Sequence, residues 1–179
     1  MSQNIAESKK RNNISEYIIH MYQTEDLIRV YDFDMDQIKQ YVISHIPAND
    51  EERKEIAEWY EQVMEKMKNE KIEAKGHLNE VQQYVAELSG IMKELKTSDK
   101  SFQEIYKTAH PHIKEGIEYS QGSITDEVQI CLNGIYGLLL ARLNGREVPA
   151  EIMEGINSYG DVLSYLTYKY KQKNYLSEN

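Results

Sequence analysis

Apolar residues recur at steps of three and four along almost the whole chain, which is the spacing of one face of an α-helix. No segment alternates apolar and polar residues in the way that a half-buried β-strand does. Two seams, in which apolar residues alternate steps of three and four, are especially regular. One runs from Ile152 to Tyr170, and the clearest consists of Leu78, Val81, Val85, Leu88, Met92 and Leu95. The pattern therefore predicts an all-α fold.

Prolines, glycines and capping residues divide the pattern into about seven helices. Asn13 is suited to cap the first helix, Thr125 the sixth, and Pro149 opens the seventh. Pro111 interrupts the fifth, where we expect a bend. The first two predicted helices cover residues 14–31 and 34–45. The third begins after Asn49 and the fourth near Lys75. The fifth and sixth cover residues 101–119 and 126–144, and the seventh begins at Pro149.

The helix over residues 126–144 is apolar on nearly all sides, so we expect it to lie at the centre of a compact helical bundle. Its small residues Gly134, Gly137 and Ala141 offer one surface on which a neighbouring helix can pack closely. With 179 residues, the chain has the length of one domain. We predict a single all-helical domain over residues 1–179, with an ordered core of 12–173 and frayed ends.

Charge and cysteine content restrict the compartment and the partners. A formal net charge of −9 disfavours general binding to nucleic acid, because phosphates would be repelled. No segment has the run of about 20 apolar residues that a membrane-spanning helix needs. Only one cysteine is present, so no internal disulfide can form. We therefore expect an acidic cytoplasmic protein that binds neither nucleic acid nor membrane.

Helix 14–31 contains charged residues within its apolar face. Glu25 and Arg29 fall in the arc of Ile14, Ile18 and Ile28, and Asp26 lies toward its edge. Buried charges are costly unless they are paired, and Arg29 is correctly spaced to pair with either acid. One interpretation is an ion-pair network that fixes the position of the helix. The other is a polar pocket that binds a ligand.

The sequence contains little that indicates a catalytic or metal-binding motif. The paired Glu-x-x-His motifs of di-iron bundles are absent, although the five histidines could still converge in space. Cys131 lies in the most apolar helix and is expected to be core. His20 lies on the face opposite the charged cluster, where we expect it to be solvated or to contact another helix. We assign no catalytic residue, metal site or cofactor, and an enzyme is the less favoured class.

Several stretches resemble a known family. The segment from Asn13 to Arg29 reads Glu-Tyr-Ile, then Met-Tyr-Gln, then Glu-Asp-Leu-Ile-Arg. It resembles the opening helix of an uncharacterised Bacteroidetes family of all-helical cytosolic proteins, domain-of-unknown-function family 4924. Glu58-Trp59-Tyr60, Lys75 to Leu78 and Ile135 to Leu140 extend the similarity, which covers residues 10–172. The resemblance implies a small all-α protein and brings no activity or catalytic residue.

Two functional hypotheses remain. The first is a module that binds another protein or a second copy of itself, without catalysis; it rests on the two seams and on a last helix rich in tyrosine. The alternative is a bundle, enzymes included, that binds a small ligand or metal at a polar core site around Glu25, Asp26 and Arg29. The candidate ligand-binding residues are Gln23, Glu25, Asp26, Arg29 and His77.

Overall fold

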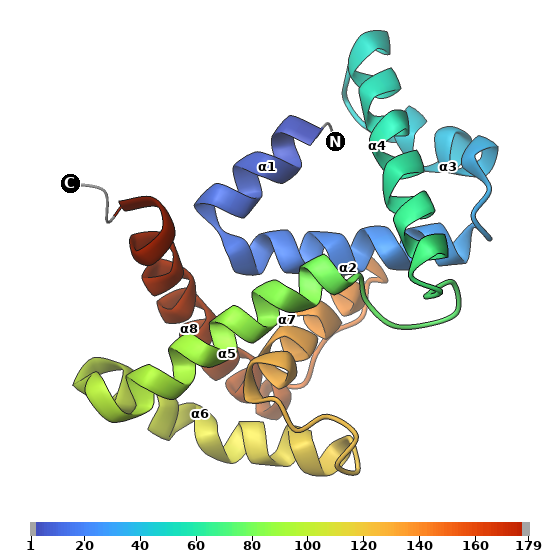
Figure 1. Ribbon diagram of the computed structural model, residues 1–179. Coiled ribbons are helices and arrows are strands. Elements are labelled where there is room, and N and C mark those ends of the chain that lie inside the picture. Colours follow the sequence, from blue (N-terminus) through green and yellow to red (C-terminus); the bar gives the residue numbers. More distant parts are fainter. Residues whose placement is uncertain (1–2, 177–179) are drawn as a thin grey trace. The chain divides into compact units, whose positions relative to one another are not determined.

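The computed structural model describes residues 3–176, and within this range the chain forms eight α-helices and no strand (Figure 1). Its contacts divide the chain into two compact units, Met1–Gln83 and Tyr84–Asn179, with the boundary inside helix α5. The all-α prediction is confirmed. The expectation of one domain stays a prediction. Of the ends expected to fray on either side of the predicted core 12–173, residues 1–2 and 177–179 lie outside the described residues, whereas residues 3–11 and 174–176 are helical.

Unit 1 is organised around α2, against which α1 and α4 both pack (Figure 1). Asn13 caps α2 by accepting a hydrogen bond from the backbone N–H of Glu16 (3.0 Å). Asn49 and Glu52 form a reciprocal capping box at the start of α4. The unit comprises α1 (Gln3–Asn12), α2 (Ile14–Val30), α3 (Met35–Tyr41), a short 3₁₀ helix (Ile43–His45), α4 (Asp50–Asn69) and the first turn of α5 (Asn79–Ser98).

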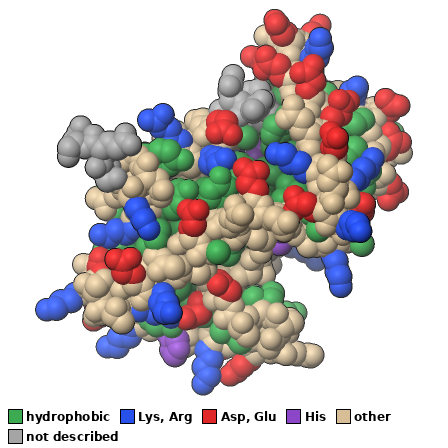
Figure 2. Space-filling view, viewed as in Figure 1, with side chains coloured by type: hydrophobic (Ala, Val, Ile, Leu, Met, Phe, Trp, Pro, Cys, Tyr) green, Lys and Arg blue, Asp and Glu red, His purple; other side chains and the backbone are tan. Residues whose placement is uncertain are grey.

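The predicted apolar faces of unit 1 are buried. In α2, Ile14, Ile18, Met21 and Ile28 are all less than 5% exposed. The opposite side of α4 is charged: Figure 2 shows acidic side chains gathered over this helix, whose first turn carries three of them. Acidic groups at a helix N-terminus are favourable because they oppose the positive end of the helix dipole. The buried stripe of α4 consists of Ile56, Trp59, Tyr60, Val63 and Met67.

Unit 2 is a group of helices in which α8 packs on both α6 and α7. The tyrosine on the α8 seam, Tyr159, donates a hydrogen bond to the backbone carbonyl of His112 in α6 (2.5 Å). Its ring lies against Gly134 of α7, where a β-carbon would come within 2.5 Å. The unit contains the rest of α5, then α6 (Lys100–Tyr119), α7 (Glu127–Leu143), α8 (Ala150–Lys171) and a π-helical turn (Gln172–Leu176).

Helix α7 departs from the prediction of a central, fully buried helix. Its first half is buried through Val128, Cys131 and Leu132, whereas Leu140 is 38% and Leu143 61% exposed. A helix that is apolar on all sides is buried only along the part of its length that neighbouring helices cover. The cap of α7 is Asp126, which accepts from the backbone N–H of Gln129, so the prediction of Thr125 was wrong by one residue.

Two further differences concern helix ends. Residues 3–12 form α1, a polar helix that the apolar pattern did not predict. Ile152, the first member of the second seam, is 55% exposed, because it lies in the first turn of α8. The later members of that seam are buried, and so is the whole seam of α5. No helix among the described residues is long and apolar enough to cross a membrane.

Candidate ligand-binding site on helix α2 and the α4–α5 loop

The loop between α4 and α5, residues 70–78, is shaped by two left-handed residues. Lys71 (φ 57°) ends α4 by donating its N–H to the carbonyl of Lys68, and Gly76 (φ 102°) turns the chain back toward α5. A side chain at Gly76 would be strained, because L-residues rarely adopt this conformation. His77 follows this turn directly.

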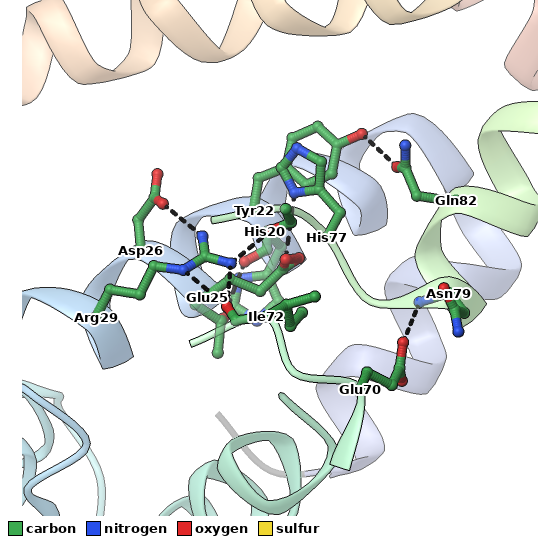
Figure 3. A network of polar contacts seen from close by, with 12 residues as sticks. His20, Tyr22, Glu25, Asp26, Arg29, Glu70, Ile72, His77, Asn79 and Gln82 are labelled. Atoms are coloured by element: carbon green, nitrogen blue, oxygen red, sulfur yellow. Dashed lines mark hydrogen bonds and ion pairs between the residues drawn. The ribbon is translucent and has the colours of Figure 1, made fainter. Parts of the chain in front are cut away.

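Arg29 of α2 holds the loop in place through backbone carbonyls. Its guanidinium donates to the carbonyl of Ile72 (3.0 Å) and to that of Gly76 (2.5 Å). A further hydrogen bond, 3.2 Å long, runs to the carboxylate of Asp26. Figure 3 shows the side chain reaching from α2 to the loop. Because a guanidinium presents several donors in a fixed plane, this one side chain can hold the loop at two positions, Ile72 and Gly76.

Glu25 and His77 form the centre of the site (Figure 3). The Glu25 side chain is completely buried, and its Oε2 lies 3.2 Å from Nδ1 of His77, whose side chain is 29% exposed. A carboxylate oxygen accepts, so the hydrogen of this bond lies on Nδ1. With the hydrogen on Nδ1, the other nitrogen of a neutral imidazole, Nε2, is an acceptor.

Tyr22 completes the setting of His77. The two rings stack with their centroids 3.8 Å apart, and the Tyr22 hydroxyl donates to Oε1 of Gln82 in α5 (3.0 Å). The imidazole is therefore held by a carboxylate at one edge and by an aromatic ring on one face. In the same loop, Glu70 accepts a hydrogen bond from the backbone N–H of Asn79 (2.6 Å) and so caps the start of α5.

One polar atom of the site has no partner. Oε1 of Glu25 is buried and makes no hydrogen bond with any residue that the structure describes. A carboxylate can accept about four hydrogen bonds, and burying it with a single one is costly. Such an atom marks either strain or a place where a further group binds.

His20 belongs to a different environment. Its ring stacks on Trp59 of α4, with centroids 5.5 Å apart. Burial, and to a smaller extent the charge of Lys9, lower the pKa of His20 to about 4. Of the two positions expected from sequence, the contact with a neighbouring helix is the one observed.

The structure brings four of the five candidate residues together. Glu25, Asp26 and Arg29 meet the loop of His77, while Gln23 is half-buried and has no polar contact within the described part of the chain. Arg29 pairs with Asp26, the nearer of its two possible acids, and Glu25 turns to His77 instead. Sequence reasoning missed Tyr22 and the loop carbonyls, since contacts 43 to 60 residues apart leave no periodic signal.

Metal and thiol chemistry have no assembled site here. No group of three or more histidine, cysteine, aspartate or glutamate side chains is placed to hold a metal ion within residues 3–176. Cys131 is free and buried, and burial raises the pKa of its thiol. The expectation that Cys131 belongs to the core is confirmed.

Comparison with known proteins identifies the family. Its model, described as Domain of unknown function (DUF4924), matches residues 3–176. The chain belongs to this family. The DUF4924 match spans α1 to the π-helical turn, so both α2 and the loop lie within it. No curated protein and no solved structure matches the chain.

Proposed function

We propose that the protein binds a small molecule at the site formed by α2 and the α4–α5 loop, with Glu25 as the anchoring group. The observation that supports this is the unpaired Oε1 of a fully buried carboxylate, lying beneath a histidine that is part-exposed. Most buried side-chain polar atoms in folded proteins have at least one hydrogen-bond partner, so an oxygen without one calls for an explanation. A ligand that donates a hydrogen bond to Oε1 would complete the site.

The remaining residues support binding more than catalysis. Arg29 is engaged with two backbone carbonyls and Asp26, and the Tyr22 hydroxyl is bonded to Gln82. Neither is therefore free to act on a substrate in this arrangement. A nucleophile activated by an adjacent base, which acyl transfer requires, is not among these contacts. We place the protein among non-catalytic binding proteins of the cytoplasm.

The test is native mass spectrometry of the protein as it is purified from cells. The wild-type chain is expected to retain a small molecule in part of the population, and Glu25→Gln is expected to lose it. Glu73→Gln, which removes an equally charged but exposed carboxylate from the same loop, is the matched control and should retain the molecule. Equal retention by Glu25→Gln and Glu73→Gln would reject Glu25 as the anchor.

A second candidate function is self-association through the second half of α7. Leu140 and Leu143 are exposed there, and the sequence contains no acidic residue between Glu127 and Glu147. In a chain of net charge −9, two copies repel each other least where acidic groups are missing. This favours a second copy of the chain as the occupant of that surface.

Light scattering during size-exclusion chromatography tests this second function. The wild-type chain is expected to form a dimer at high concentration, and Leu143→Glu to shift it to monomer, since an introduced charge would be buried. Tyr119→Glu, at a residue that is 93% exposed in another helix, serves as control. A wild-type monomer at all concentrations would exclude self-association.

A further inference from the structure

We infer that the ligand of this site carries an ammonium group, which pairs with Glu25 after displacing the imidazole of His77. The inference rests on the proposed function and adds to it the chemical class of the ligand. Its starting point is the balance of donors around Glu25. The carboxylate has one hydrogen-bond partner among the described residues, Nδ1 of His77, and its Oε1 forms no hydrogen bond with any of them.

The protein's own cation is committed elsewhere. Arg29, one helical turn beyond Glu25, directs its donors to Ile72, Gly76 and Asp26 and makes no ion pair with Glu25. Its side chain is 16% exposed and is fixed from both sides by the loop. The positive charge that a buried carboxylate favours is therefore left for another group to supply.

His77 covers Glu25 in a manner that can be reversed. Its side chain is held by one hydrogen bond and one stacked ring, and no residue in the described part of the chain forms a hydrogen bond with its Nε2. Rotation about the side-chain bonds would uncover Glu25 without disturbing the carbonyls that Arg29 holds. Displacement of the imidazole would uncover the face of the Tyr22 ring on which it stacks, and an aromatic face attracts a cation.

The same groups disfavour other ligand classes. An anion would meet the carboxylates of Glu25 and Asp26, and the nearby guanidinium is already neutralised in part by Asp26. A transition metal needs three or more protein ligands in most sites, and no such group is assembled in the described chain. A neutral hydroxyl could donate to Oε1, but it would leave the buried charge uncompensated. An ammonium group supplies both hydrogen bonds and charge.

The test is a titration of the full-length ¹⁵N-labelled protein, followed by NMR, with methylammonium chloride. Tetramethylammonium chloride at equal concentration is the control probe, because it has the charge but no N–H donor. We expect saturable shifts of the amide signals of residues 71–78 with methylammonium only. Glu25→Gln should weaken this binding roughly tenfold or more, the usual effect of losing a charged hydrogen bond, whereas Glu73→Gln should not.

His77→Ala gives the sharper readout, and it serves also if Glu25→Gln fails to give a dispersed spectrum. In this variant no imidazole competes with methylammonium for Glu25. Methylammonium should therefore bind the variant more tightly than it binds the wild type. Weaker binding to His77→Ala, or equal shifts with both probes, would overturn the inference. A co-purified molecule that Glu25→Gln loses, together with no response to methylammonium, would preserve the site and reject the ammonium class.

Discussion

At the scale of single residues, Arg29 determines whether the α4–α5 loop has one conformation. Its bonds to the carbonyls of Ile72 and Gly76 are the ones that fasten the loop to α2. A lysine keeps the charge, but its single ammonium lacks the planar fork of donors with which the guanidinium reaches Ile72, Gly76 and Asp26 together. Arg29→Lys should lower the free energy of unfolding by about 1–3 kcal/mol.

Hydrogen–deuterium exchange checks this prediction locally. The amides of residues 72–77 should exchange faster in Arg29→Lys, while those in the middle of α4 and α5 keep their wild-type rates. Arg142→Lys, at an exposed position of α7, is the control. Unchanged loop exchange in Arg29→Lys would mean that the loop is held by its own backbone and not by Arg29.

His20 makes stability depend on pH in a defined interval. Its pKa in the folded protein is about 4, below the ordinary value of 6.5, because the ring is buried against Trp59. Above pH 6.5 the ring is neutral in both states and costs nothing. Between pH 6.5 and 4 the unfolded state binds a proton that the folded state does not, so the free energy of unfolding falls by about 3 kcal/mol.

Denaturant titrations across that interval isolate the effect of His20. His20→Phe keeps an aromatic ring against Trp59 but cannot be protonated, so its stability should fall less between pH 6.5 and 4 than that of the wild type. His45→Gln, at an exposed histidine, should follow the wild-type curve. The same slope in all three proteins would show that His20 is solvated in the folded state.

At the scale of helices, the contact of α7 with α8 depends on a glycine. A β-carbon at Gly134 would lie 2.5 Å from the ring of Tyr159, which cannot withdraw because its hydroxyl is bonded to the His112 carbonyl. Gly134→Ala should therefore cost about 1–3 kcal/mol by overpacking. Gly137→Ala meets no atom within 4 Å and should stabilise α7 by about 1 kcal/mol through its helix propensity.

Thermal or denaturant unfolding of the two alanine variants gives this comparison directly. The two glycines lie one turn apart on the same helix, so differences in propensity cancel and the packing of Tyr159 remains. Variants of equal stability would contradict the close approach of α7 and α8 at Gly134.

The helices show which features a sequence discloses. Periodicity located the buried faces of α2, α4 and α5, because burial of one face imposes the spacing of three and four. It failed at α1, which is polar, and at the second half of α7, where apolar residues are exposed. In both cases the neighbours of the helix, and not its own pattern, determine the outcome.

At the scale of the whole chain, the candidate site was predictable on one side only. The sequence indicated Glu25 and Arg29 as charged residues within an apolar stripe. It gave no indication that they contact a loop 43 to 52 residues away. His77 was named from the family resemblance alone. The carbonyls that Arg29 binds belong to the backbone and carry no sequence signal at all. Contacts of this kind become visible only once the chain is folded.

The hydrogen bond that Glu25 accepts from Nδ1 of His77 is the contact on which the proposed site depends most directly. Long-range ¹H–¹⁵N NMR of the histidine rings, at a pH where they are neutral, reports which ring nitrogen bears the hydrogen. We predict the Nδ1–H tautomer for His77 in the wild type and a loss of that preference in Glu25→Ala. His77 in the Nε2–H form in the wild-type protein would contradict the bond, and with it the site built on Glu25.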